Sequence, residues 1–71
     1  MASPHRRAVG EAIRSYRKQG RLSQEKLAEK ADLNPKYLSE VERGCANISL
    51  DALVRIAKAL RIPVVDLLQD I

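Results

Sequence analysis

The chain has 71 residues, 45% of them apolar, two tyrosines as its aromatic side chains, and a formal net charge of +4. This length suits one small domain, residues 1–71, with an aliphatic core. One Cys and one His cannot supply an internal disulfide or a Cys/His zinc site, so we expect no metal and no cofactor. No apolar run approaches the roughly 18 residues of a membrane span, and no signal peptide is recognisable. We therefore expect a cytoplasmic protein that binds no membrane.

The positive charge is concentrated in the first 31 residues, which carry eight Lys or Arg against three acidic residues. The remaining residues carry five basic and six acidic side chains. Such an uneven distribution is expected of a surface that approaches a phosphate backbone. Charge alone leaves open a basic face that is merely solvated. A basic amphipathic helix also suits a membrane surface, but this chain has no Trp or Phe to insert.

The first predicted helix begins at Ser3-Pro4, a good N-cap followed by a proline suited to the first helical position, and runs to about Gln19. Gly20 is expected to end it. Residues 1–4 are expected to fray. The inward face should consist of side chains spaced at three and four: Val9, Ala12, Ile13 and Tyr16.

Residues 23–44, SQEKLAEKADLNPKYLSEVERG, predict two short helices joined by a tight turn. Ser23 caps the first helix, and Asn34-Pro35 starts the second. Gly44 is the expected left-handed stop. The two apolar faces are expected to consist of Leu27, Ala28 and Ala31, and of Tyr37, Leu38 and Val41. This is the plan of a helix-turn-helix, and it favours sequence-specific DNA binding.

Two further helices are predicted after the loop that follows Gly44. Ser49 caps the first, whose apolar residues recur at three and four, and Arg61-Ile62 ends it. Pro63 opens a short last helix. The inward residues are expected to be Leu50, Leu53, Ile56, Ala57 and Leu60, followed by Val64, Leu67 and Leu68. No segment alternates like a strand, so the fold class is all-α, with five helices.

Nearly the whole chain, about residues 8–68, resembles the XRE family of helix-turn-helix regulators. The landmarks that match in order are SQ-x-x-LA, YLS-x-x-ERG, NISL, and IAKAL followed by LL. The resemblance implies a compact five-helix lambda-repressor-like fold and a homodimer on double-stranded DNA. GCANISLDALVRIAKAL is particularly similar to the small controller proteins of restriction–modification systems. Short phage repressors and antitoxins are neighbouring alternatives.

Three positions depart from the pattern of the family. The family usually has Gly directly before Leu22, where this chain has Arg21, with Gly20 one position earlier. Asp32 replaces the usual turn Gly, and Ile48 replaces a frequent Pro. Because Asp tolerates left-handed backbone better than most residues, we expect the turn to survive at some cost.

The resemblance also implies roles on DNA, with the third helix in the major groove. Tyr37 has a second interpretation, packing at the helix boundary. Glu40 has the alternative of pairing with Lys36 on the surface, and Gln24 that of a plain polar first-turn residue. The expected base-reading residues are Asn34, Pro35, Lys36, Tyr37, Ser39 and Glu40, and the expected phosphate contacts are Ser23, Gln24 and Arg43.

Arg17 and Glu42 match a pair that forms a partly buried ion pair in related repressors. If they pair here, Arg17 orients the recognition helix. A short final helix cannot bury all its apolar side chains, so we expect a homodimer interface there; the alternative is that Val64 and Leu68 complete the core and Ile71 frays. Cys45 is expected to be an incidental thiol rather than a redox sensor, and His5 has no metal role. The expected interface residues are Val64, Val65, Leu68 and Ile71.

An enzyme is excluded by inventory: the sequence has no Gly-rich phosphate loop, no nucleophile with a base, and no interior His. We expect a dimeric transcription regulator that binds a palindromic operator, autoregulatory or a restriction–modification controller, with no small-molecule ligand evident. The alternative from another class is an antitoxin or similar module whose main partner is a protein. The chain could also be the DNA-binding part of a longer regulator, although its Met start and its end just after the fold suit a complete product.

Overall fold

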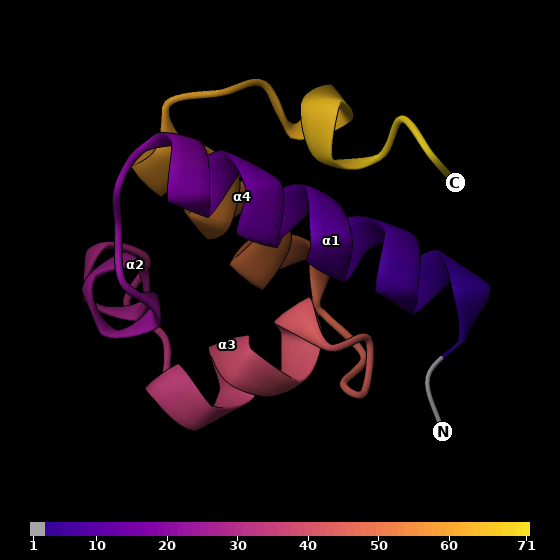
Figure 1. The fold of residues 1–71 in the computed structure, drawn as a ribbon, viewed down its shortest axis with the longest axis horizontal. Coiled ribbons are helices and arrows are strands. Elements are labelled where there is room, and N and C mark those ends of the chain that lie inside the picture. Colours follow the sequence, from indigo (N-terminus) through magenta and orange to yellow (C-terminus); the bar gives the residue numbers. More distant parts are fainter. Residues whose placement is uncertain (1–2) are drawn as a thin grey trace.

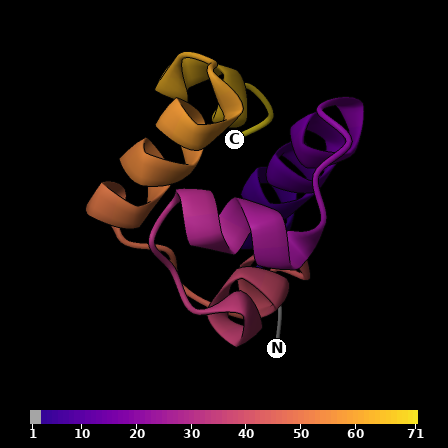
Figure 2. The same cartoon turned by 90° about the vertical axis from the view of Figure 1, so that its left-hand side faces the viewer.

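The structure is a computed structural model that describes residues 3–71, within which the chain forms four α-helices and a final 3₁₀ helix (Figure 1). These are α1 (Pro4–Gln19), α2 (Gln24–Lys30), α3 (Pro35–Glu42), α4 (Leu50–Leu60) and η1 (Val64–Leu67). The described residues contain no strand, which confirms the all-α class. α3 lies at the edge of the molecule opposite η1, with α2 beside it (Figures 1 and 2). The outer side of α3 is therefore not covered by another helix.

All four α-helices begin with the predicted caps. The hydroxyls of Ser3, Ser23 and Ser49 accept hydrogen bonds from backbone N–H groups three residues ahead, at 3.1, 3.0 and 3.1 Å. The Asn34 Oδ1 accepts from the amides of the next turn. Each cap satisfies an N–H group that has no partner within its helix. The caps therefore set where the helices begin.

Residues 3 and 4, which are expected to fray, stand at the start of α1. Pro4 is the first residue of α1, and Ser3 caps it, so this turn is held by a side-chain hydrogen bond. Residues 1 and 2 lie outside the described part of the chain.

The expected fifth helix is a 3₁₀ helix of four residues, so the five-helix count is not confirmed. Its hydrogen bonds include those from Asp66 N to Pro63 O and from Leu68 N to Val65 O, each spanning three residues. So short a segment cannot repay the cost of nucleating an α-helix. Packing fixes it instead, because the side chain of Leu67 is 1% exposed.

Left-handed backbone occurs at Arg21 (φ +58°), Asp32 (φ +56°), Arg61 (φ +60°) and Gly44 (φ +76°). Gly44 was expected as a left-handed stop, and this is confirmed. Gly20 follows the end of α1 as predicted, but its φ is −82°, and the left-handed conformation falls on Arg21 instead. The turn therefore keeps its shape without a glycine at the position that needs one.

The core is aliphatic and draws on every helix. Ile13, Leu27, Leu38 and Ile56 are fully buried, and Tyr16 packs against them from the side. One expected inward residue is misplaced: Leu50 is 72% exposed. It is the first residue of α4, and it lies beyond the edge of the core that Leu53 and Ile56 complete.

Candidate nucleic-acid interface

The turn between α2 and α3 is closed by backbone hydrogen bonds from Asp32 N to Glu29 O (3.2 Å) and from Leu33 N to Ala28 O (2.8 Å). Ala28 is fully buried, and α2 and α3 are in contact with each other. Because Ala28 is fully buried, a larger side chain there would require the surrounding core to move. The expected helix-turn-helix is thus present, with the turn bending at Asp32.

The predicted base-reading residues do not all face solvent equally. Asn34, Pro35 and Lys36 are exposed, whereas Ser39 and Glu40 are half-buried. The Asn34 Oδ1 already accepts from the amides of Lys36 (2.8 Å) and Tyr37 (3.4 Å). Only its amide N–H groups are left to donate to a base. Lys36 is the one charged side chain in the first turn of α3, and it is exposed.

Tyr37 is half-buried and packs against the core. Its hydroxyl donates to the carbonyl oxygen of Asn47 at 3.2 Å, which ties α3 to the loop before α4. This geometry favours packing, one of its two expected roles. The described residues contain no ion pair between Lys36 and Glu40, the surface pairing considered for Glu40.

Arg17 and Glu42 form the expected ion pair between α1 and α3. Arg17 Nε lies 2.7 Å from Glu42 Oε2, and Nη2 lies 3.0 Å from Oε1, so the contact is bidentate. The third guanidinium nitrogen donates to the carbonyl oxygen of Leu22 at 2.8 Å. Both residues are buried, and no buried side-chain N or O atom of the described residues lacks a partner. The pair therefore fixes the end of α3 against α1 and against the start of α2.

The three predicted phosphate contacts differ in the hydrogen bonds that their side chains already make within the protein. Gln24 donates its amide to Glu42 Oε1 at 3.1 Å, which makes it part of the ion-pair network; a second N–H remains for an anion. The exposed Ser23 uses its oxygen as the cap of α2, so its hydroxyl proton remains for donation. Arg43 is exposed, and its Nε donates to Ser39 O at 3.4 Å. Sequence reasoning missed the contact between Gln24 and Glu42.

An apolar surface lies away from these residues, around the start of α4 and the end of the chain. Leu50, Val65 and Ile71 are 72, 62 and 60% exposed, while Val64 and Leu68 are half-buried against the core. A groove of about 370 Å³ runs between α1, the end of α3, the loop before α4, the first half of α4 and the chain end, with Ile48, Leu50, Leu68 and Ile71 in its walls. Of the four predicted interface residues, Val65 and Ile71 are thus the most exposed.

Leu50 was missed as a surface residue. The signal that could have found it is its position directly after the cap Ser49.

Neither a membrane span nor a metal site is present in the described residues. None of their helices combines the length and apolar character needed to cross a bilayer. No group of three or more His, Cys, Asp and Glu side chains among them is arranged to hold a metal ion. The Cys45 thiol is exposed, and it lies 3.8 Å from the carbonyl oxygen of Arg43.

These features place the protein in the helix-turn-helix class: α3 is capped and exposed, a tight turn joins it to α2, and a buried ion pair holds its end. A sequence model of that family, described as helix-turn-helix, matches residues 13–67. The chain is 42% identical over 69 residues to the control protein C.BamHI of Bacillus amyloliquefaciens, covering 96% of this chain and 85% of that protein.

Solved structures agree with this match. The restriction–modification controller protein C.AhdI from Aeromonas hydrophila superposes with a TM-score of 0.86 at 37% identity, covering 87% of this chain and 94% of that one. The biofilm master regulator SinR, solved in complex with DNA, superposes with a TM-score of 0.81 at 38% identity, covering 84% and 97%. The chain therefore belongs to the helix-turn-helix family. It is a transcription regulator and not an enzyme.

Proposed function

We propose that this protein binds a palindromic DNA operator as a homodimer, with α3 in the major groove. The observation that carries this proposal is the exposed N-terminal turn of α3, locked in place by the Arg17–Glu42 pair. Eight residues of α-helix span about 12 Å, which is also about the width of the major groove. SinR, a relative with the same fold, has been solved with DNA, which supports this assignment.

Base reading is assigned to the start of α3. Lys36 can donate to guanine O6 or N7, and the Asn34 amide can donate to the same kind of acceptor. Pro35, Ser39 and Glu40 complete the surface that faces the groove, and Tyr37 shapes it from behind. Ser23, Gln24 and Arg43 are the proposed phosphate contacts, and Gln24 is held near Arg43 by its hydrogen bond to Glu42 at the C-terminal end of α3.

Two observations support the proposed homodimer: the small size of the reading surface and the exposed apolar side chains. One short helix reads about four base pairs, whereas a two-fold dimer reads two half-sites about 34 Å apart. The molecule measures 26 × 23 × 21 Å, so two copies in contact can place their α3 helices at that separation. Leu50, Val65 and Ile71 supply the exposed apolar surface for the contact, with Val64 and Leu68 beneath.

The biological role we propose is control of restriction–modification genes or of the protein's own promoter. C.BamHI and C.AhdI are named as controllers, and the chain is similar to both over most of its length. Such a regulator works in the cytoplasm, where bacterial DNA is accessible. A chain of 71 residues would suffice for this function as one DNA-binding domain.

The test is a binding titration against the DNA upstream of the protein's own gene and against a scrambled duplex of equal length, at two salt concentrations. A preference of about a thousandfold or more for the upstream DNA is expected, which is the low end for specific binders. Equal and strongly salt-dependent binding to both duplexes would contradict operator recognition. It would favour the alternative of an antitoxin-like module whose main partner is a protein.

A further inference from the structure

Two glycines bring the N-terminal half of α1 onto the C-terminal end of α3. A Cβ on Gly10 would overlap the carbonyl oxygens of Val41 and Glu42. A Cβ on Gly44 would lie 2.6 Å from Arg7 Cγ and 2.9 Å from Arg7 Cα. The backbone of Arg7 is therefore in close contact with the residue that follows Arg43. Two exposed arginines far apart in the sequence thus lie at the same end of the recognition helix.

The charges at the start of α1 have the wrong sign for the helix itself. Its first turn contains Arg6 and Arg7 and no acidic residue. Cations at the positive end of a helix dipole are unfavourable, and an anion bound there would reverse the sign of the interaction. The helix alone gives no reason for these residues. A bound anionic partner would give one.

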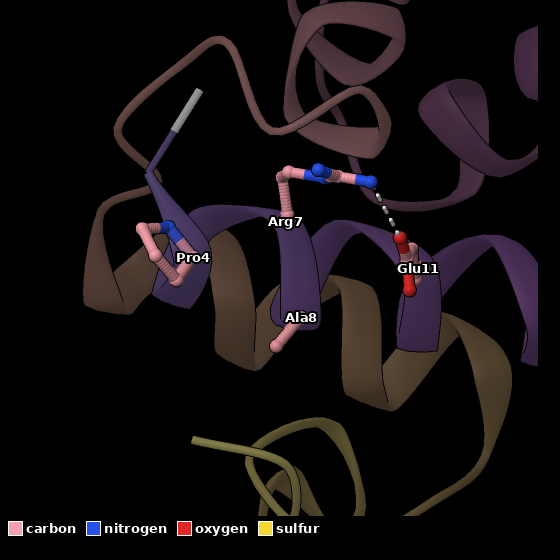
Figure 3. Close-up of a pocket in the computed structure, with 4 residues that line it drawn as sticks. All are labelled: Pro4, Arg7, Ala8 and Glu11. Carbon is pink, nitrogen blue, oxygen red and sulfur yellow. Dashed lines mark ion pairs between the residues drawn. The ribbon is translucent and has the colours of Figure 1, made fainter. Parts of the chain in front are cut away.

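Arg7 has one weak intramolecular partner. Its Nη2 lies 3.6 Å from Glu11 Oε1, and both side chains are about two-thirds exposed, at 64% and 68%. Figure 3 shows the Arg7 side chain reaching along α1 toward Glu11. The basic residue precedes the acidic one, which is the weaker order for an i,i+4 pair. Because an exposed pair of this kind contributes little, a phosphate could displace the Glu11 carboxylate at small cost.

We propose that Arg7 joins Arg43 in a phosphate clamp on the DNA backbone at the C-terminal end of α3, and that Glu11 holds the Arg7 guanidinium until DNA binds. This inference rests on the proposed DNA-binding function. A guanidinium suits a phosphate because its N–H groups can donate two parallel hydrogen bonds. The clamp would stand at the end of α3 opposite Asn34, and it would hold the helix in register without reading sequence.

The test compares Arg7→Gln with Lys58→Gln on a scrambled duplex of about 20 base pairs, long enough for two half-sites. Arg7→Gln keeps an aliphatic stem against Gly44 and removes the charge. Lys58→Gln makes the same charge change on the exposed side of α4. Arg7→Gln should lower the slope of log K against log salt by about 1.8, which is about 0.9 for each protomer of the dimer, so its loss of affinity should be about twelvefold greater at roughly 50 mM than at roughly 200 mM salt. Lys58→Gln should leave the slope unchanged.

Two further variants separate the clamp from a structural role. Arg7→Lys should restore the slope, since it restores a cation. Glu11→Gln should tighten binding in the wild-type background and have no effect in the Arg7→Gln background, because Glu11 acts through Arg7. Circular dichroism should show the same helix content in all these variants.

Equal salt slopes for Arg7→Gln and Lys58→Gln, with wild-type binding intact, would overturn the clamp and leave the proposed function standing. A Glu11→Gln effect that persists without Arg7 would likewise overturn the role assigned to Glu11. Failure of the wild-type chain to bind any duplex would overturn the proposed function itself, and the clamp with it.

Discussion

Lys36 is the residue at which base reading is most directly testable, because it is exposed and its backbone N–H is already fixed by the Asn34 cap. Lys36→Ala should lower the ratio of operator to scrambled-duplex affinity by about 5- to 150-fold, corresponding to about 1–3 kcal/mol for a good base contact. The measurement is a pair of titrations at one salt concentration. Equal loss on both duplexes would show that Lys36 contacts phosphate instead.

Glu42 tests whether the recognition helix depends on the buried ion pair. Glu42→Gln leaves the buried Arg17 charge without its counter-ion, and removing one partner of a buried pair costs about 3–5 kcal/mol. A core this small rarely supplies more than about 3–5 kcal/mol in total. Urea unfolding followed by circular dichroism should therefore find Glu42→Gln largely unfolded at low denaturant.

The matched control is Glu11→Gln, which breaks the exposed pair with Arg7 and should cost no more than about 1 kcal/mol. Replacing both buried partners, as in Arg17→Met/Glu42→Leu, should recover much of the loss, because no buried charge is left unpaired. Similar unfolding midpoints for Glu42→Gln and Glu11→Gln would show that the buried pair is not needed for the fold.

The element most open to improvement is the turn between α1 and α2, where glycine and arginine stand in the less favourable order. Gly20 has ordinary backbone (φ −82°) with room for a Cβ, whereas Arg21 adopts the left-handed conformation that suits glycine. The double variant Gly20→Ala/Arg21→Gly should raise the free energy of unfolding by about 1 kcal/mol. This corresponds to a Tm rise of about 4–8 °C in a domain of this size, measured by thermal unfolding.

Gly44→Ala, at the glycine that follows α3, is the control in which a glycine with left-handed backbone is replaced. Its φ of +76° and the nearby Arg7 backbone leave no unstrained place for a methyl group, so it should destabilise the protein. A lower Tm for Gly20→Ala/Arg21→Gly would contradict this prediction. It would mean that the Arg21 side chain stabilises the fold by more than its left-handed backbone destabilises it.

Starts of helices were predictable from sequence because caps act locally. Ser3, Ser23, Asn34 and Ser49 each bond within three residues, so their roles depend on chain distances that sequence spacing already gives. The Arg17–Glu42 pair spans 25 positions, and it was anticipated through family resemblance rather than spacing.

Tertiary packing accounts for the places where the structure differs from the sequence-based predictions. Helical spacing placed Leu50 with the inward face of α4, but it cannot say where the core ends along the helix axis. The same is true of the final segment, whose 3₁₀ form depends on the anchoring of Leu67. The bonds of Gln24 to Glu42 and of Tyr37 to Asn47 follow from how separate elements meet, which residue spacing does not give.

At the scale of the whole molecule, the proposed DNA contacts and the exposed apolar side chains lie on different surfaces. The exposed turn of α3 carries the proposed DNA contacts, while Leu50 and Ile71 line the groove between the α4 start and the chain end, and Val65 is exposed on η1. In the described residues these three are the large hydrophobic side chains left exposed. Covering them by a second copy would stabilise the fold and set the spacing of two reading helices.

Leu50→Glu tests whether this exposed apolar surface is the dimer interface. Since Leu50 is 72% exposed and stands at the first position of α4, a carboxylate there costs no core packing and suits the helix dipole. It would, however, place two like charges across an isologous apolar contact. The variant should therefore sediment at the protomer mass of 7.9 kDa at concentrations where the wild-type chain has twice that mass. Its operator affinity should fall by about a hundredfold or more as the avidity of two linked half-sites is lost.

Ser15→Glu, which adds the same negative charge at an exposed position of α1, should leave both the mass and the operator affinity unchanged. A Leu50→Glu protein that stayed dimeric with wild-type affinity would place the interface elsewhere, and would leave the apolar groove as a surface for a different protein.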